Sequence, residues 1–334
     1  MNVVIEGTCD ARFRDVRDAF ASNFERDLEL GAALSVSIDG HNVIDIWGGF
    51  LDEAQTRAWQ RDSLACIFSC TKGVVAVLAL MLADRGLIDL DAPVARYWPE
   101  FAQNGKGEIP VRWLLTHQSA LSAIDAPLPF GSLSNWDLMI DALAAQAPVW
   151  TPGDGHGYHG VTYGHLVGEV VRRVTGLSCG TAMRQLLCDP LDLDIHMPLP
   201  EHEEARTADM VLGMPTAARP SPTFFDHWKP GDLGPKSFRN PPDCVFEIRP
   251  DTIVPSGKHR DHDMSILALQ NADIIADIGH EIPGLVRQAK PGYVFREPGA
   301  INLTSHDLQH LLGCLLAHGL SPLDLFKKSP HIFR

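Results

Sequence analysis

The chain has 334 residues, of which 45% are hydrophobic and 21% charged; this fits one large domain or two ordinary ones and excludes a wholly disordered chain. Acidic residues outnumber basic ones by 42 to 28, which gives a net charge of −14. An acidic surface repels nucleic-acid phosphates and anionic lipids, so we expect neither a nucleic-acid partner nor a membrane partner.

The first predicted elements are an amphipathic helix and a β-hairpin. The apolar residues that recur at helical spacing are Phe13, Val16, Phe20 and Phe24. This spacing predicts a helix with one buried face. Residues 34–38 and 43–47 then alternate between apolar and polar as two strands, with a tight turn at Asp39 and Gly40 between them.

Further helices are predicted from apolar periodicity and from the glycines that end them. The segment 69–83 is apolar nearly all round, which is typical of a helix buried in the middle of a domain. The segment 163–174 has the clearest amphipathic spacing, and Gly176 ends it. The other predicted helical segments are 111–115, 136–145 and 305–318.

The strongest chemical pattern is a serine followed three residues later by a lysine, Ser69 and Lys72. On a helix these two side chains share one face, with Cβ atoms about 5–6 Å apart. A serine in the first helical turn lies near the positive end of the helix dipole, which favours an oxyanion. The helix around Lys72 is apolar, so the pKa of the amine should fall and the neutral amine becomes available as a base.

A second chemical candidate is Tyr158, which stands between glycines in the segment 157–160. Glycines let the backbone approach a substrate closely, and a phenol beside a lysine can relay protons to a leaving group. The alternative is a loop tyrosine that only packs against the helix after it.

Three segments together resemble the serine β-lactamase and penicillin-binding-protein superfamily, and most closely its esterase branch, the family VIII carboxylesterases. The first is SCTK at 69–72, followed by GLIDLDAPV at 86–94 and YWPE at 97–100. The second is VRWLLTHQSAL at 111–121. The third is WTPG at 150–153 with GYHG at 157–160, which leads into LVGE at 166–169 and VTG at 174–176.

The resemblance implies the β-lactamase/transpeptidase-like fold, an α/β (α+β) structure with an antiparallel sheet flanked by helices and a mostly helical part. In this chain the α/β part would comprise about 1–65 and 285–334 and the helical part 66–200, with 200–285 unassigned. The implied roles are Ser69 as nucleophile, Lys72 as its partner and Tyr158 as general base. The residues predicted to bind substrate are Gln118, His159 and Gly160.

The predicted activity is a carboxylesterase that acts on small acyl esters through an acyl-enzyme, without a metal or organic cofactor. The alternatives are a β-lactamase or D,D-peptidase-like hydrolase, or a catalytically impaired relative that serves as a binding or scaffold protein. The last alternative arises because we find no Lys-Thr-Gly or His-x-Gly strand after the segment 303–319, where relatives have one. Many relatives also have Asn where this chain has Gly160, and Gly where it has Ala120.

Two other patterns compete with this interpretation. The segment 176–180 fits G-x-S-x-G, but that elbow requires a preceding strand and a helix is predicted there. His156, His159 and the segment 259–263 resemble metal ligands but lack the spacing of a hydrolytic zinc site, so solvated loop histidines are favoured.

The cysteines and the N-terminus bear on the compartment. The seven cysteines are Cys9, Cys66, Cys70, Cys179, Cys188, Cys244 and Cys314. Their odd number and the absence of a C-x-x-C pair indicate reduced thiols rather than disulfides or structural zinc. With no apolar signal segment at the N-terminus, we expect a cytoplasmic protein, and the sequence leaves a homo-oligomer open.

Overall fold

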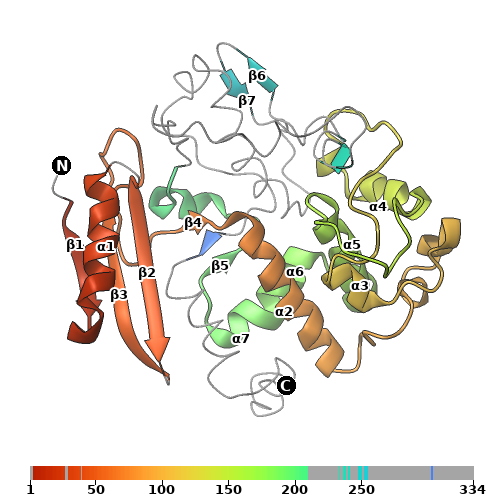
Figure 1. The fold of residues 1–334 in the computed structure, drawn as a ribbon, viewed down its shortest axis with the longest axis horizontal. Helices are drawn as coiled ribbons and strands as arrows, with labels where there is room; N and C mark the ends of the chain where they lie inside the picture. Colours follow the sequence, from red (N-terminus) through yellow and green to blue (C-terminus); the bar gives the residue numbers. More distant parts are fainter. Residues whose placement is uncertain are drawn as a thin grey trace.

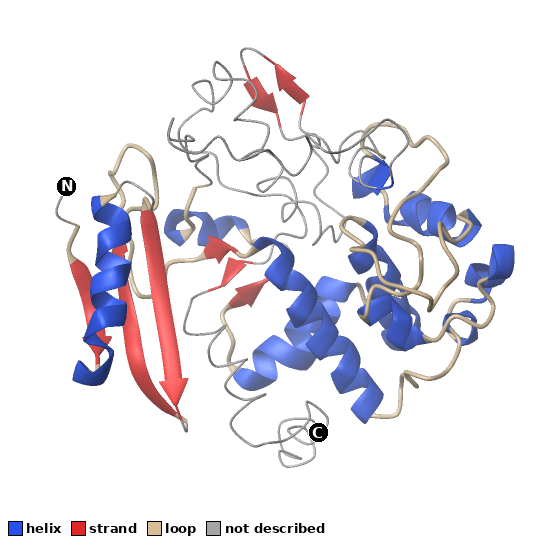
Figure 2. Cartoon of the chain, viewed as in Figure 1, coloured by secondary structure: helices blue, strands red, loops and turns tan. Residues whose placement is uncertain are grey.

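The structure is a computed structural model. The residues that it describes are 3–26, 29–38, 40–209, 233, 236, 237, 240, 247–249, 252–254, 302 and 303. Within them, a three-stranded sheet with one helix lies beside a larger group of helices (Figure 1). Figure 2 shows the same division, with the long strands on one side and most helices on the other.

The N-terminal sheet is antiparallel, with strand order β1-β3-β2. Its elements are β1 (Ile5–Cys9), β2 (Gly31–Ile38), β3 (His41–Gly49) and the helix α1 (Arg14–Glu25). Phe20 of α1 packs against Ile44 and Ile46 of β3, and this contact buries the apolar face of the helix on the sheet. The predicted helix and hairpin are therefore confirmed. The strand β1 was not predicted, because its ends are half-buried and its middle is exposed, without an apolar alternation.

The helical part is built around two buried helices, α2 (Thr71–Asp84) and α5 (Thr162–Thr175), which pack against each other. Both were predicted, and Gly176 ends α5 in the left-handed conformation that glycine adopts without strain. The helix α4 (Trp136–Ala145) has the predicted bounds. The remaining α-helices are α3 (Val111–Leu115), α6 (Cys179–Met183) and α7 (Asp189–Leu191). The single-turn and irregular helices are η1 (Ala11–Phe13), η2 (Phe68–Cys70), η3 (Val94–Arg96), η4 (Pro99–Gly105), η5 (Ser132–Ser134), η6 (Arg184–Cys188) and η7 (Glu201–Arg206).

A small second sheet joins three segments that are far apart in sequence. Its strands are β4 (Ala65–Cys66), β5 (Ile195–His196) and β8 (Asn302–Leu303), in the order β4-β8-β5. Both pairings are antiparallel, and Leu303 lies opposite Ala65 on one side and Ile195 on the other. A segment from the last tenth of the chain thus lies beside the strand that leads into Ser69. A further antiparallel pair consists of β6 (Glu247–Arg249) and β7 (Thr252–Val254).

Several sequence predictions fall outside the described residues. These are the helix at 305–318, the histidines and aspartates at 259–263, and the region in which a third motif was sought. The proposed domain boundaries stay a prediction. Among the helices that the structure describes, none is both long and apolar enough to span a membrane.

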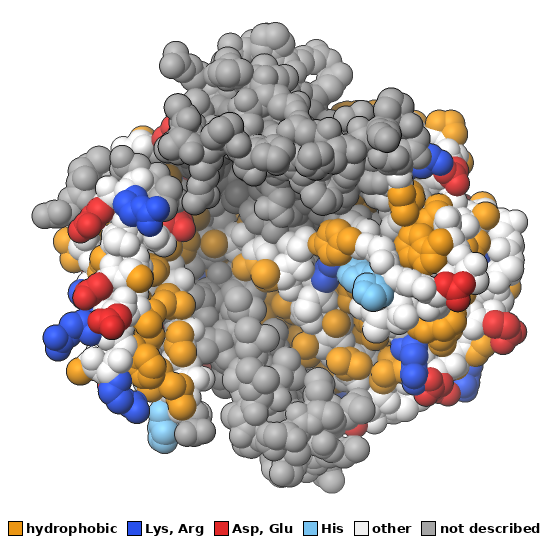
Figure 3. Space-filling view, in the orientation of Figure 1, with side chains coloured by type: hydrophobic (Ala, Val, Ile, Leu, Met, Phe, Trp, Pro, Cys, Tyr) orange, Lys and Arg blue, Asp and Glu red, His pale blue; other side chains and the backbone are white. Residues whose placement is uncertain are grey.

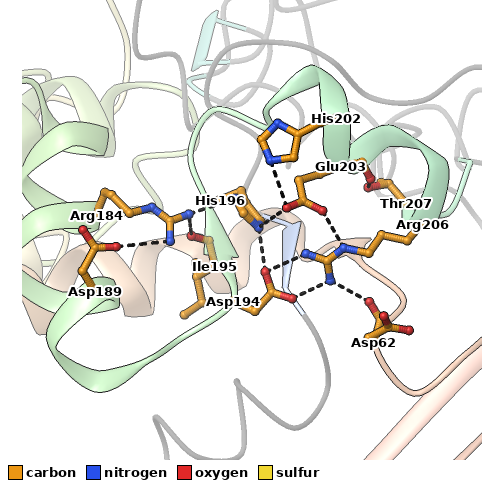
Figure 4. A network of polar contacts seen from close by, with 10 residues as sticks. All are labelled: Asp62, Arg184, Asp189, Asp194, Ile195, His196, His202, Glu203, Arg206 and Thr207. Carbon is orange, nitrogen blue, oxygen red and sulfur yellow. Dashed lines mark hydrogen bonds and ion pairs between the residues drawn. The ribbon is translucent and has the colours of Figure 1, made fainter.

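A polar network connects η7 to β5 and to the loop before β4 (Figure 4). The guanidinium of Arg206 donates to both carboxylate oxygens of Asp194, to Glu203 and to the backbone oxygen of Asp62. His196 lies against the same carboxylates, with its Nε2 2.7 Å from Asp194 Oδ1. Burial alone would raise the pKa of Asp194, but the hydrogen bonds from His196 and Arg206 outweigh it and hold that pKa well below its usual range.

We expect Arg206→Met to lower the free energy of unfolding by about 1–2 kcal/mol at pH 7, because two partly buried carboxylates lose their partner. Carboxylates with lowered pKa stabilise the fold above pH 4, and this stabilisation is lost as the pH falls. Urea unfolding of wild type from pH 7 to pH 3 should therefore show a steeper loss of stability than the variant does. Arg12→Met is the control, because the Arg12 side chain is 69% exposed, against 26% for Arg206. Equal losses in the two variants would contradict a structural role for the network.

Candidate active site

Ser69, Lys72 and Tyr158 meet at one point. Lys72 Nζ lies 3.3 Å from Ser69 Oγ, and the hydroxyl oxygens of Tyr158 and Ser69 are 2.6 Å apart. The strand β4 and the turn η2 deliver Ser69 to the N-terminal end of α2, two residues before the α-helix begins. Lys72 stands in the first turn of α2, and Tyr158 comes from the loop before α5. The amine of Lys72 and the phenol of Tyr158, from two distant segments, thus both contact the Ser69 oxygen, and a proton can lie on any of the three groups.

Lys72 is held in an apolar environment. Its side chain is buried, and its Nζ lies 4.9 Å from the ring centre of Tyr158 and 5.9 Å from that of Tyr163. Among the described residues, no carboxylate forms an ion pair with it. Burial lowers the pKa of the amine to about 8. Lys72 can therefore give up and take back a proton near neutral pH.

The tyrosine loop, residues 150–160, is bonded to the segment 117–121. The amide of Gly157 donates to His117 O, and the amide of His159 donates to His117 Nδ1, each at 3.1 Å. Both residues that flank Tyr158 are therefore bonded to one histidine. Further along the loop, the amide of Gly153 donates to Gln118 O at 3.0 Å.

His159, the residue after Tyr158 in this loop, is completely buried. Its Nδ1 donates to Gly157 O at 2.6 Å, and its Nε2 accepts from the amide of Leu121 at 3.0 Å and from the Ser119 hydroxyl at 2.9 Å. Burial lowers the pKa of the imidazole to about 4, so the ring is neutral at pH 7 and can accept and donate at the same time. Both ring nitrogens are engaged inside the protein, and the predicted substrate contact of His159 stays a prediction.

The other two residues predicted to bind substrate are not among the hydrogen-bond partners of Ser69 in the described part of the chain. Gly160 is buried at the start of the turn into α5. Gln118 is half-buried and its Oε1 accepts from the Thr116 hydroxyl at 2.7 Å. Their contribution to substrate binding stays a prediction.

One competing pattern is resolved by the described residues. The G-x-S-x-G segment follows the helix α5 and not a strand, and Ser178 caps the N-terminus of α6 by accepting from the amide of Thr181. It is therefore not a nucleophile elbow.

Within the described part of the chain, Asp194, His196 and Glu203 are close enough to suggest a metal site (Figure 4). However, the guanidinium of Arg206 already bonds both carboxylates. Arg184 donates to His196 Nδ1 at 2.8 Å, so His196 Nε2 carries its proton toward Asp194. We interpret this cluster as an ion-pair network.

Sequence reasoning missed His117 as a residue of the site. It stands in the 111–121 motif, where its neighbours suggested only a loop after a short helix. The sequence carries no signal for it. The structure shows a half-buried histidine whose backbone is left-handed.

Comparisons with known proteins extend these observations. A family model described as Beta-lactamase matches residues 20–238. The chain is similar to "Esterase/beta-lactamase LipL" of Mycobacterium tuberculosis, with 39% identity over 214 residues that cover 64% of this chain and 49% of that protein. The chain spans about half the length of the curated relatives it matches.

Two solved structures share both sequence and fold with the chain. One is described as a family VIII carboxylesterase and is 42% identical, with a TM-score of 0.59 over 62% of this chain and 57% of the other. The second is a penicillin-binding protein homologue from Caulobacter crescentus, which is 39% identical, with a TM-score of 0.61 over 71% of this chain and 66% of the other.

Tryptophan rings pack directly on two glycines of the tyrosine loop. A Cβ on Gly153 would lie 2.6 Å from the ring of Trp113, and a Cβ on Gly157 would lie 2.8 Å from the ring of Trp150. Gly155 has open space instead. Gly153 and Gly157 are therefore too closely packed to carry a side chain, whereas Gly155 has room for one.

We expect Gly157→Ala to lower the free energy of unfolding by about 1–3 kcal/mol, because an aromatic ring cannot yield to the added methyl group without moving the loop. Thermal and urea unfolding measure this effect. The matched control is Gly155→Ala, which should leave stability unchanged or slightly raised. A Gly157→Ala protein as stable as this control would show that the loop is not packed as described.

Proposed function

The chain belongs to the beta-lactamase family, and from this premise we propose that it is a serine hydrolase that cleaves small carboxylic esters. Its fold is the β-lactamase/transpeptidase-like fold of antiparallel sheet and helices that the sequence predicts. The observation that carries the proposal is that Lys72 Nζ and the Tyr158 hydroxyl both lie within hydrogen-bonding distance of Ser69 Oγ.

The proposed first step is acyl transfer to Ser69. The Tyr158 phenol first gives its own proton to the neutral amine of Lys72, whose Nζ lies 3.3 Å from Ser69 Oγ. As Ser69 Oγ attacks the ester carbonyl, its proton passes to the deprotonated Tyr158 oxygen 2.6 Å away. A new bond forms between Oγ and the acyl carbon, and the bond from that carbon to the alkoxy oxygen breaks. The alkoxy oxygen takes the proton and leaves as the alcohol.

The second step returns the enzyme to its starting state. Water gives a proton to the same pair and its oxygen attacks the acyl carbon. The bond to Ser69 Oγ then breaks, the acid is released and the serine regains its proton. Lys72 suits this exchange because its pKa of about 8 lies close to the working pH, so neither protonation state is strongly favoured.

Ester cleavage is favoured over lactam cleavage by the named relatives. Two of the similar proteins are described as an esterase/β-lactamase and a family VIII carboxylesterase, at 39% and 42% identity. The structures described as β-lactamases are 17% and 18% identical and support the fold alone. On the face that Figure 3 shows, hydrophobic side chains lie over both the sheet side and the helical side, among polar ones.

The first test is covalent labelling. A fluorophosphonate should add one label to the wild type by intact mass, and Ser69→Ala should add none, because the label reports an activated serine. The unlabelled wild type should also hydrolyse p-nitrophenyl butyrate faster than nitrocefin. A wild type that takes up no label would favour the binding or scaffold alternative, and a label that persists in Ser69→Ala would assign the nucleophile to another serine.

The second test is the pH dependence of labelling. Because burial lowers the pKa of Lys72 to about 8, the neutral fraction of the amine increases as the pH rises through 8. The labelling rate should therefore rise between pH 6 and pH 9 with an apparent pKa near 8, which belongs to the coupled Lys72 and Tyr158 pair.

Lys72→Arg is the matched variant for this test. A guanidinium stays protonated over this range, so the rise should disappear and the rate should fall about 10²–10⁴-fold. A variant with the wild-type rate and pH profile would exclude Lys72 from the proton relay.

A further inference from the structure

We propose that His117 is a positioning residue that keeps Tyr158 in hydrogen-bonding distance of Ser69. This inference rests on the proposed function, because it concerns how the same site is assembled. His117 does not bond to Ser69 in any contact described above. It acts through the backbone on both sides of Tyr158.

The hydrogen bonds of His117 straddle the tyrosine. Its backbone oxygen accepts from the amide of Gly157, and its Nδ1 accepts from the amide of His159, each at 3.1 Å. Because the amides of Gly157 and His159 are both held, the backbone of Tyr158 between them has little freedom to rotate. The backbone contacts on both sides therefore help to direct the phenol toward Ser69.

The imidazole ring of His117 also contacts the aromatic rings around the site. Its centre lies 5.1 Å from that of Tyr158 and 5.1 Å from that of Tyr163. Tyr163 in turn lies beside Lys72, since its hydroxyl donates to Lys72 O at 3.4 Å. His117 thus lies between the loop that carries the phenol and the helix α5 next to it, and its ring limits how far the phenol can turn.

The backbone at His117 indicates that its side chain serves a purpose. Its φ is +61°, in the left-handed region that a residue with a Cβ enters only at a cost in free energy. Glycine would avoid this cost, yet the chain has a histidine here. Residues held in such conformations concentrate at functional sites, where the surrounding contacts maintain them.

The protonation state of His117 agrees with this role. Burial, the charge of Lys72 and the nearby His156 lower its pKa to about 4. The ring is therefore neutral at pH 7, with the lone pair of Nδ1 free to accept from His159 and its proton on Nε2.

The test compares His117→Gly with His117→Asn. Both residues tolerate the left-handed backbone, and both remove the ring, but only asparagine keeps an acceptor oxygen close to the place of Nδ1. His117→Gly should slow fluorophosphonate labelling and lower kcat for p-nitrophenyl butyrate about 10–100-fold, because a small displacement of Tyr158 is costly. KM should stay within about 3-fold of wild type. His117→Asn should recover both rates to within about 3-fold of wild type.

The outcomes separate this inference from the proposed function. A wild type that neither labels nor hydrolyses the ester would remove the proposed function, and the inference with it. If wild type is active and Ser69→Ala is not, the inference fails when His117→Gly retains wild-type rates, or when only its KM changes. It also fails when His117→Asn is 10-fold or more slower than wild type, and this comparison holds even if the glycine variant does not fold.

Discussion

The arrangement of this site depends on one set of hydrogen bonds, those between the tyrosine loop and the segment 117–121. The imidazole of His159 is completely buried and connects Gly157 O to the amide of Leu121. A neutral imidazole can do this because one nitrogen donates while the other accepts. Tyr158 itself is half exposed, so these bonds hold the loop that carries it. With them, its hydroxyl lies 2.6 Å from that of Ser69.

The other half of the site depends on burial. The strand β4 leads into η2 and α2, so Ser69 and Lys72 are placed by a rigid element whose apolar side chains form the centre of the helical part. The same packing that buries α2 removes water from Lys72 and lowers its pKa to about 8. The core thus supplies both the geometry and the electrostatics of the amine, and the loop contacts supply the phenol.

The helices and the three site residues could be predicted from sequence where the local patterns are strong. The bounds of α4 and the end of α5 at Gly176 follow from periodicity and from capping, which depend on neighbouring residues alone. Ser69, Lys72 and Tyr158 were identified from spacing and from resemblance, and the structure brings them together.

What could not be predicted depends on contacts between distant residues. His159 stands between glycine-rich neighbours and was interpreted as a substrate ligand, because nothing local shows that Leu121 and Ser119 bury it. The pairing of β8 with β4 joins residues more than two hundred positions apart, and two-residue strands carry no periodic signal. The left-handed backbone of His117 likewise arises from its tertiary contacts.

The central claim is that Lys72 and Tyr158 act on Ser69 as one unit. A double-mutant cycle of fluorophosphonate labelling rates, with Lys72→Met, Tyr158→Phe and the double variant, tests it most directly. We expect each single change to slow labelling strongly and the double variant to be little slower than the worse single variant, because a relay that lacks either member is already broken. Rate losses that multiply in the double variant would show that the two side chains act independently and would contradict the account.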